Sequence, residues 1–465
     1  MAKYKASRYN HVIPIGDGRE LTFNALSRSL EVLDAGEAAF LRELSLGDEH
    51  DSEDPRIERF SKARYVLRKE VDERSVVRVM YASQRFPDSR LTLTIMPTAV
   101  CNFACDYCFQ GADKPSEWMT KDVQAQLLAF IERRAPELRH FNIAWYGGEP
   151  LLAMQVIRDV SRDAIELAKR HGLSFASMVV TNGYRLSRAI ADELHALGVR
   201  EMQITLDGPC EIHDQKRPLL GGQGTYERIV ENLAEAVGQT GIQYSVRINV
   251  DRRNAPFING LLDDLAARGL ANRPNLSIYT APVETATEGC HSVSSEVMHK
   301  ADYSKVEVGM MKRARKLKII ASAEPPLFAS QCAAIRPMAF VVCPNGDLHK
   351  CWNTVNEPHK KVGSLFDEAR LEEPDATNDL WMSWTPLQDP ICRDCTTLPL
   401  CGGYCAYHFV YENDIKTPDS RPCPSWKYNL PEKLLMLAKD RKLLPESLVV
   451  DLPPPALPAT ASASP

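Results

Sequence analysis

Apolar and polar positions over the middle of the chain repeat as short apolar runs separated by segments with helical spacing. Six runs predict strands, at 91–100, 141–150, 175–183, 200–208, 244–251 and 276–283. Segments between them, such as KDVQAQLLAFIERRA and SRAIADELHALG, place apolar residues on one helical face. Six such strand–helix units predict an α/β fold with a parallel sheet, a partial (β/α)6 TIM-like barrel over residues 86–290. Several strands end in turn residues, at the edge where parallel barrels carry their chemistry.

The chain before this region has a different pattern. HVIPI and ELTFNAL predict two strands around a turn at 16–18, and DAGEAAFLREL predicts a helix capped by Asp34. PRIERFSKARYVL predicts a second helix, YVLRKEVDERSVV a strand pair or wing, and 47–54 a polar loop. We therefore expect an N-terminal domain over residues 1–85.

Composition narrows the class of protein. The net charge of −5 argues against nucleic acid as a main partner, because phosphate binding requires a basic face. No apolar run is long enough to span a membrane, and the N-terminus has no apolar signal segment, so we expect a cytoplasmic protein. Thiols stay reduced there, and the 13 cysteines are better explained as metal ligands than as disulfides.

The first cysteine group is Cys101, Cys105 and Cys108, directly after the first predicted barrel strand. Three thiolates on one loop can hold three irons of a cubane cluster and leave the fourth open, and the spacing differs from the paired arms of zinc sites. With Tyr107 as its aromatic residue, the segment resembles the CxxxCxΦC signature of the radical S-adenosylmethionine (SAM) superfamily. The resemblance implies that SAM chelates the open iron and is cleaved to methionine and a 5′-deoxyadenosyl radical.

Further residues match SAM-binding motifs of that family. The resemblance implies that the GGE motif after the second strand binds the SAM amino group, and that a hydroxyl and an arginine twelve residues later also contact SAM. Asn182, in the turn after the third strand, is a further candidate. The implied SAM contacts are Tyr107, Gly147, Gly148, Glu149, Asn182, Thr205 and Arg217.

The second cysteine group lies in residues 331–430 and resembles the seven-cysteine SPASM domain of radical SAM enzymes that modify peptides and proteins. The resemblance implies two auxiliary 4Fe–4S clusters, and so three clusters in all. The nearer cluster would be held by Cys332, Cys351 and Cys405. The distal cluster would be held by Cys392, Cys395, Cys401 and Cys423. A bridging segment at 291–330 precedes this domain, and a helix with a Pro/Ala/Ser-rich tail at 431–465 follows it.

Cys343 is an eighth cysteine that could add a ligand to the nearer cluster. FVVCPNGDLHKC predicts a hairpin around Asn345-Gly346, in which Cys343 pairs with Leu348 and Cys351 pairs with Phe340. These pairs fall on opposite faces, so Cys343 points away from Cys351 unless a bulge inverts the register.

The expected substrate is a peptide. Sulfatase maturases carry an Asp directly after the hairpin cysteine as a base, whereas this chain has Trp352. The strands, helices and wing of residues 1–85 resemble the winged-helix recognition element of ribosomal-peptide maturases, which implies a precursor peptide whose leader binds as an added strand. The implied partners are that precursor and an electron donor such as flavodoxin or ferredoxin.

We expect hydrogen abstraction from the precursor followed by a cross-link, with a carbon–carbon bond as first choice. A thioether, backbone excision and epimerisation are alternatives, and epimerisation requires a hydrogen donor, for which Cys210 is the candidate. A second hypothesis is maturation of an enzyme side chain or a protein-derived cofactor. A third is a non-catalytic iron–sulfur carrier, against which the SAM motifs argue, because a carrier needs no SAM pocket.

Overall fold

A nine-stranded sheet organises the chain, seen in a computed structural model that describes residues 3–46, 50–51, 54–86, 89–112, 114–328, 332–367, 376–419, 421 and 423–453. Its strand order is β12-β11-β10-β9-β8-β7-β13-β14-β15. The six predicted strands form one continuous parallel part of it, which confirms the predicted α/β fold. They are β7 (Arg90–Ile95), β8 (His140–Trp145), β9 (Ser174–Thr181), β10 (Val199–Thr205), β11 (Gln243–Val250) and β12 (Leu276–Pro282).

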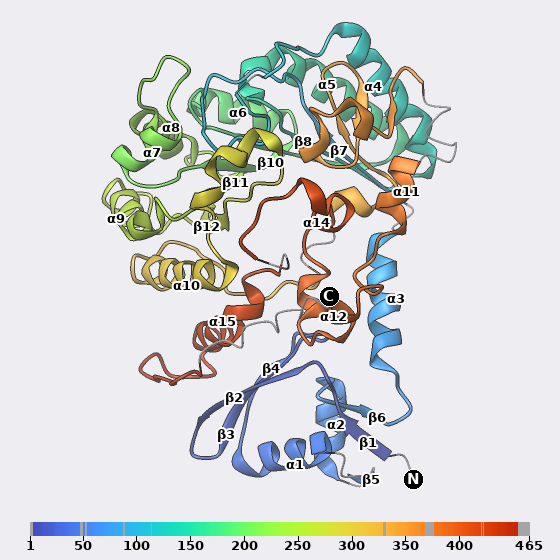
Figure 1. Ribbon diagram of the computed structural model, residues 1–465, viewed down its shortest axis with the longest axis vertical. Coiled ribbons are helices and arrows are strands. Elements are labelled where there is room, and N and C mark those ends of the chain that lie inside the picture. Colours follow the sequence, from blue (N-terminus) through green and yellow to red (C-terminus); the bar gives the residue numbers. More distant parts are fainter. Residues whose placement is uncertain are drawn as a thin grey trace, which may run out of the picture.

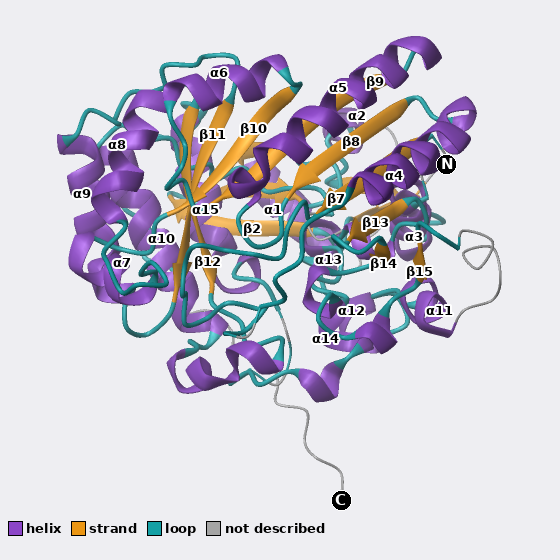
Figure 2. Ribbon diagram, turned by 90° about the horizontal axis from the view of Figure 1, so that it is seen from above, coloured by secondary structure: helices purple, strands orange, loops and turns teal. Residues whose placement is uncertain are grey.

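Helices cover one face of this sheet, and Figure 2 shows them outside the fan of strands. Along β7, Leu91, Leu93 and Ile95 are buried under the helices, whereas Thr92 and Thr94 alternate with them and are half-buried on the inner face. This period of two gives the strand one face covered by helices and a second, less buried inner face. The helices are α4 (Lys121–Arg134), α5 (Met154–His171), α6 (Arg188–Ala196), α7 (Cys210–Lys216), α8 (Tyr226–Ala236), α9 (Ile258–Ala267) and α10 (Lys300–Lys316).

The sheet extends beyond the six predicted strands. β13 (Ala339–Val342) lies parallel to β7, and β14 (Asp347–His349) and β15 (Gly363–Ser364) follow as antiparallel neighbours. The predicted hairpin is therefore present, but it continues the barrel sheet. All four residues of β13 are buried, as expected for a strand that is covered on both faces.

The predicted register of this hairpin is wrong by one residue. Val341 pairs with His349, and the amide of Cys343 donates to the carbonyl of Asp347 (2.9 Å). The cause is a three-residue turn that ends at Gly346, whose φ of 90° suits glycine, where a two-residue turn was expected.

Residues 3–68 build two small sheets and two helices at the bottom of Figure 1. The predicted hairpin of HVIPI and ELTFNAL is confirmed, and the predicted helices begin at Asp34 and Asp54, whose side chains cap them. The sheets are β5-β1-β6 and β2-β3-β4, from β1 (Lys3–Ala6), β2 (Asn10–Gly16), β3 (Arg19–Asn24), β4 (Leu30–Leu33), β5 (His50–Asp51) and β6 (Val66–Arg68). The helices are α1 (Ala35–Leu46) and α2 (Pro55–Lys62). Of the predicted loop at 47–54, residues 47–49 and 52–53 lie outside the described part of the chain.

The predicted strand pair or wing at YVLRKEVDERSVV is wrong in its second half. β6 is a short strand, and α3 (Glu73–Arg85) follows at once, because the Asp72 side chain caps it by accepting from the amide of Arg74 (3.0 Å). Val77 and Tyr81, one turn apart, are buried in the main core. This helix, which the expected 1–85 domain includes, runs from the N-terminal region to the sheet in Figure 1.

Arg85 fixes the end of α3. Its guanidinium, 4% exposed, donates to the backbone carbonyl of residue 335 and to three carbonyls within 381–384. The C-terminal region is thereby attached to α3 as well as to the sheet. It holds α11 (Ala376–Ser383), α12 (Pro390–Asp394), α13 (Leu398–Cys401), α14 (Tyr407–Val410) and α15 (Trp426–Asp440), the last packed on α10. Among the described residues, no helix has the length and apolar character needed to cross a membrane.

Candidate functional site

The first cysteine group lies on the loop that leaves the C-terminal end of β7. Cys101, Cys105 and Cys108 are half-buried free thiols, and the amide of Cys108 donates to the carbonyl of Cys105 (3.3 Å). Burial raises the pKa of Cys105 to about 12; Arg217 opposes this rise, and the two other thiols add to it. The loop therefore brings three thiols together beside an arginine.

The glycines of the GGE motif support this loop directly. Gly147 has a φ of 115°, and a Cβ on Gly148 would lie 2.1 Å from the carbonyl oxygen of Val100. The amide of Glu149 donates to that same oxygen (2.9 Å). The sequence predicted a close approach of these glycines to a ligand, whereas the structure shows their close approach to the backbone of the cysteine loop.

Glu149 is almost fully buried, and burial raises its pKa. Its Oε1 accepts from the Thr181 hydroxyl (2.6 Å) and from the amide of Leu151 (3.0 Å), and its Oε2 accepts from the amide of Asn182 (2.7 Å). The Asn182 side chain in turn donates to that of Asn102, beside the first cysteine (2.9 Å). Glu149 and Asn182 are thus brought to the cysteine loop.

A polar network joins Tyr107 to the ends of β10 and β11. The Tyr107 hydroxyl donates to Asp207 and accepts from Arg217 (2.5 Å) and from the Asn249 side chain (3.2 Å). Burial would lower the pKa of Arg217, but Cys105, Tyr107 and Asp207 around it raise it well above its usual value. Thr205, also predicted, is buried at the end of β10.

These residues fit the groups that the motifs imply. The Nε of Arg217 is buried and has no hydrogen-bond partner among the described residues, so the guanidinium keeps a donor for an anionic ligand. Three thiols on one loop provide a donor set for one iron–sulfur cluster.

The nearer C-terminal thiols come from three separate segments. Burial, together with the thiols of Cys332 and Cys405, raises the pKa of Cys351 well above its usual value. Cys343 lies apart, packed with Met96 and neighbouring apolar side chains. Cys343 and Cys351 thus belong to different packing clusters, but the strand register from which their separation was predicted is wrong.

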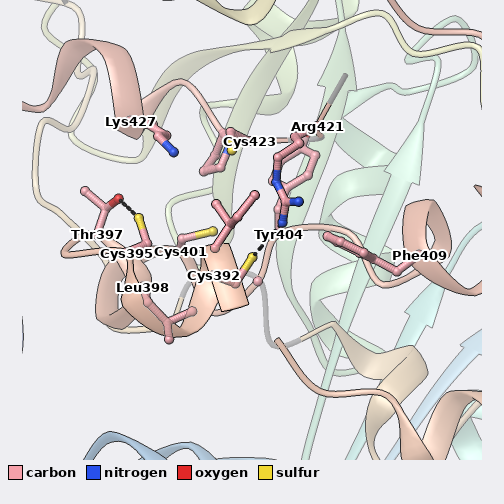
Figure 3. A pocket seen from close by; sticks show the side chains of 13 residues that line it. Cys392, Cys395, Thr397, Leu398, Cys401, Tyr404, Phe409, Arg421, Cys423 and Lys427 are labelled. Carbon is pink, nitrogen blue, oxygen red and sulfur yellow. Dashed lines mark hydrogen bonds between the residues drawn. The ribbon is translucent and has the colours of Figure 1, made fainter. Parts of the chain in front are cut away.

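The distal thiols surround one pocket, shown in Figure 3. In this pocket the Arg421 guanidinium donates a hydrogen bond to the sulfur of Cys392 (3.5 Å). The Thr397 hydroxyl and the Cys395 thiol are hydrogen-bonded to each other (2.9 Å). The four lining cysteines are Cys392, Cys395, Cys401 and Cys423. In the described part of the chain, no three His, Cys, Asp or Glu side chains converge closely enough for a single metal ion.

Tyr146, which the sequence analysis missed, lies between the first and the nearer thiol groups. Burial raises its pKa to about 12; Arg247 opposes the rise, and Cys108 and Cys351 contribute to it. Its ring stacks on Phe109 (5.8 Å) and meets Trp352 (5.7 Å). Its position directly before the GGE motif was the available signal.

Cys210 is not brought to this centre. It is the first residue of α7, its thiol contacts Asp214 (3.6 Å), and burial followed by Asp214 raises its pKa. The other charged groups that act on it are Glu227 and Arg268, on the helical side of the sheet.

Comparisons with known proteins agree with this arrangement. Mycofactocin maturase of Mycobacterium tuberculosis is 25% identical over 417 residues, which cover 83% of this chain and 98% of that protein. The serine-type anaerobic sulfatase-maturating enzyme of Klebsiella aerogenes is 22% identical over 325 residues, covering 66% and 77%.

Two solved structures share the fold. Native anSMEcpe with bound AdoMet and Cp18Cys peptide has a TM-score of 0.58 at 20% identity, covering 76% of this chain and 99% of that one. Streptococcus suis SuiB bound to precursor peptide SuiA has a TM-score of 0.52 at 13% identity, covering 90% and 99%. Residues 95–239 match the family model of the radical SAM superfamily, and they hold the first cysteine group, the GGE motif and Arg217. Residues 95–239 are therefore a radical SAM domain, which implies that the chain is an enzyme that binds SAM and a 4Fe–4S cluster.

Proposed function

We propose that this enzyme is a radical SAM maturase that modifies a ribosomally made precursor peptide. The observation that carries the proposal is the position of Tyr146, whose ring contacts both Phe109, the residue after Cys108, and Trp352, the residue after Cys351. A peptide entering there would lie between the SAM site and the nearer C-terminal thiols. The mycofactocin maturase, matched over nearly its whole length, supports this reading.

The SAM site is proposed from the residues around the cysteine loop. Cys101, Cys105 and Cys108 hold the cluster, and Arg217 donates to the SAM carboxylate through its free Nε. Glu149 receives the amino group, for which its two oxygens keep acceptor capacity beyond their three present bonds. The remaining proposed contacts are Tyr107, Gly147, Gly148, Asn182 and Thr205.

The protein positions this chemistry and shields it. When bound, the cofactors supply hydrogen abstraction by a 5′-deoxyadenosyl radical and, from the auxiliary clusters, acceptance of the second electron. The hydroxyl of Tyr107 and the carboxylate of Asp207 orient Arg217, while Phe109, Tyr146 and Trp352 form an apolar wall that restricts water near the substrate.

Two auxiliary 4Fe–4S clusters are proposed for the C-terminal region. The nearer would be held by Cys332, Cys351 and Cys405, and its separation from Cys343 favours an open iron. The distal cluster would occupy the pocket of Figure 3, held by Cys392, Cys395, Cys401 and Cys423.

The N-terminal region is proposed to bind the precursor's leader as a winged-helix-like recognition element. Its small sheets end in short edge strands, to which an extended peptide can add by backbone pairing. Arg8 bonds the carbonyl of Asp394 (3.0 Å), between two distal cysteines, so this region is held against the C-terminal one. An electron donor such as flavodoxin or ferredoxin completes the proposed partners.

The proposed product is a cross-link, first a carbon–carbon bond between an aromatic and a neighbouring side chain. Epimerisation with Cys210 as donor finds less support, because that thiol faces α7 and α8. The sulfatase-type alternative is supported by two similar proteins, but the indole of Trp352 cannot act as the carboxylate base of that reaction.

The test uses the reconstituted enzyme with SAM, a reductant and the short peptide encoded beside its gene. Mass spectrometry should show a peptide lighter by two hydrogens, formed together with 5′-deoxyadenosine. A sulfatase-motif peptide serves as the comparison substrate. Conversion of that peptide to formylglycine, with the precursor unchanged, would refute the proposal in favour of the sulfatase type.

A further inference from the structure

Three polar side chains meet on the inner face where β10, β11 and β12 lie side by side. Arg247 on β11 is in register with Thr205 on β10 and with Tyr279 on β12. Residues in register on neighbouring strands share a face, so Arg247 lies next to the proposed SAM contact Thr205. The Tyr279 hydroxyl donates to the side chain of Gln203 (2.5 Å).

Arg247 carries a charge that the described part of the chain does not neutralise. Its Nε donates to the neutral side chain of Asn249 (2.7 Å), and it makes no ion pair with any described Asp or Glu. Burial would lower the pKa of Arg247, but the hydroxyls of Tyr279, Tyr146 and Tyr107 around it raise that pKa above its usual value. A half-buried guanidinium surrounded by neutral groups loses hydration without gaining a counter-ion, so an anionic ligand would stabilise it.

Apolar surface is exposed beside this guanidinium. Trp352 is 40% exposed and Tyr279 is 36% exposed, although both are large aromatic side chains. Tyr279 is in register with Arg247, and Trp352 meets the ring of Tyr146, on whose pKa the Arg247 charge acts. Aromatic surface and a forked donor together favour a ligand that carries an apolar group next to a carboxylate.

We propose that Arg247 is a substrate-binding residue that holds a carboxylate of the peptide, while Tyr146, Tyr279 and Trp352 receive the apolar side chain next to it. This assignment rests on the proposed function and names its substrate class: a peptide segment in which an apolar residue adjoins a carboxylate. The carboxylate is either a C-terminal α-carboxylate or an Asp or Glu side chain.

SAM itself is a weaker candidate for this arginine. The SAM carboxylate already has Arg217, whose Nε has no hydrogen-bond partner among the described residues and whose Nη1 donates to Tyr107 in the cysteine loop. Arg247 instead lies away from the cysteine loop in the sequence, in register with the half-exposed Tyr279 on the next strand of the sheet.

The test measures binding of three small probes to the reconstituted, SAM-bound enzyme by saturation-transfer NMR. They are N-acetylphenylalanine, its amide, and N-acetylaspartylphenylalanine amide, so that the α-carboxylate, no carboxylate and a side-chain carboxylate are compared. We expect one carboxylate probe to bind about tenfold more tightly than the neutral amide, and which one does so identifies the source. Equal binding of all three would overturn the assignment.

Variants of Arg247 test whether this side chain causes the preference for a carboxylate. Arg247→Gln should remove the preference for the carboxylate, and Arg247→Lys should keep part of it. Arg200→Gln is the matched control, because Arg200 is exposed on β10 and, among the described residues, hydrogen-bonds only the backbone carbonyls at 195 and 199. A fall in SAM affinity in Arg247→Gln as large as the fall in probe binding would make Arg247 a SAM contact and refute the proposal.

The probes are bound and not turned over, so this result is independent of the proposed reaction. Absence of SAM cleavage by the reconstituted wild-type enzyme would refute the proposed function, while the probe measurements would still decide the role of Arg247.

Discussion

The two cysteine regions of this protein are built in different ways. Cys101, Cys105 and Cys108 stand on one loop of eight residues, positioned by the end of β7 and by the glycines after β8. The C-terminal thiols come from several segments between 332 and 423, and only packing against the sheet and α3 brings them together. A local site depends on its loop, whereas the assembled site depends on the whole C-terminal architecture.

The largest expected effect is a loss of SAM cleavage that leaves the iron of the C-terminal region in place. Replacing Cys101, Cys105 and Cys108 together by Ala should abolish 5′-deoxyadenosine formation, because no thiolate then remains on the loop to hold the cluster. The C-terminal iron should stay, since those thiols lie on separate segments. The measurement is chromatography of 5′-deoxyadenosine with an iron assay on the same sample. SAM cleavage by the triple variant would show that the two regions are wrongly divided.

Two cysteine variants test which thiols hold the nearer cluster of the C-terminal region. Cys351→Ala should lose about four irons per chain, the content of one cubane. The Cys343→Ala variant should keep the iron content of the wild type, because Cys343 packs with Met96 away from the other thiols. Iron per chain after anaerobic reconstitution checks both. Equal losses in the two variants would mean that Cys343 is also a ligand.

The attachment of the C-terminal region to α3 can be weakened at one residue. Arg85→Met should lower the free energy of unfolding by about 2–4 kcal/mol, because four backbone carbonyls lose a buried charged donor. Arg78→Met, on the exposed face of the same helix, is the control and should change it by less than about 0.5 kcal/mol. Urea unfolding of both variants measures the difference. A similar, small change in both would show that Arg85 does not hold the regions together.

The smallest expected effect is the pH dependence of stability that comes from a histidine near the first cysteine group. His213 is fully buried, its Nδ1 accepts from the amide of Asp207 (3.1 Å), and burial followed by Arg217 and Lys216 lowers its pKa well below the usual value. The unfolded chain therefore binds a proton below about pH 6.5 that the folded one does not, so stability falls as the pH drops, by about 1.4 kcal/mol per pH unit.

The variant His213→Gln removes this titration. Urea unfolding at pH 6.5 and 5.5 should show a smaller loss of stability in His213→Gln than in the wild type. An identical pH dependence in both proteins would contradict the neutral, buried state of His213.

The sequence was sufficient wherever a signal was local. The six parallel strands, the Asp34 cap and the cysteine loop follow from periodicity and spacing within short segments. The helix α3 was missed because apolar residues such as Val79, which is exposed, lie between the buried Val77 and Tyr81, so the sequence shows no clear helical stripe.

Tertiary contacts decided the rest. β13 was predicted as half of a hairpin, and its pairing with β7 depends on residues far away in the chain. Its register depends on one extra turn residue before Gly346, which spacing alone does not reveal. Tyr146 and Arg247 were missed because each looks like an ordinary residue of a predicted strand until the fold places it beside Phe109 and Trp352 or beside the SAM contact Thr205.

The central claim is that two separate regions of the chain bind iron–sulfur clusters, and metal content tests it most directly. Anaerobically reconstituted protein should contain about twelve irons per chain, the content of three cubanes, with negligible zinc. The triple loop variant should retain about eight. Zinc in place of iron in the wild type would contradict the account for both regions.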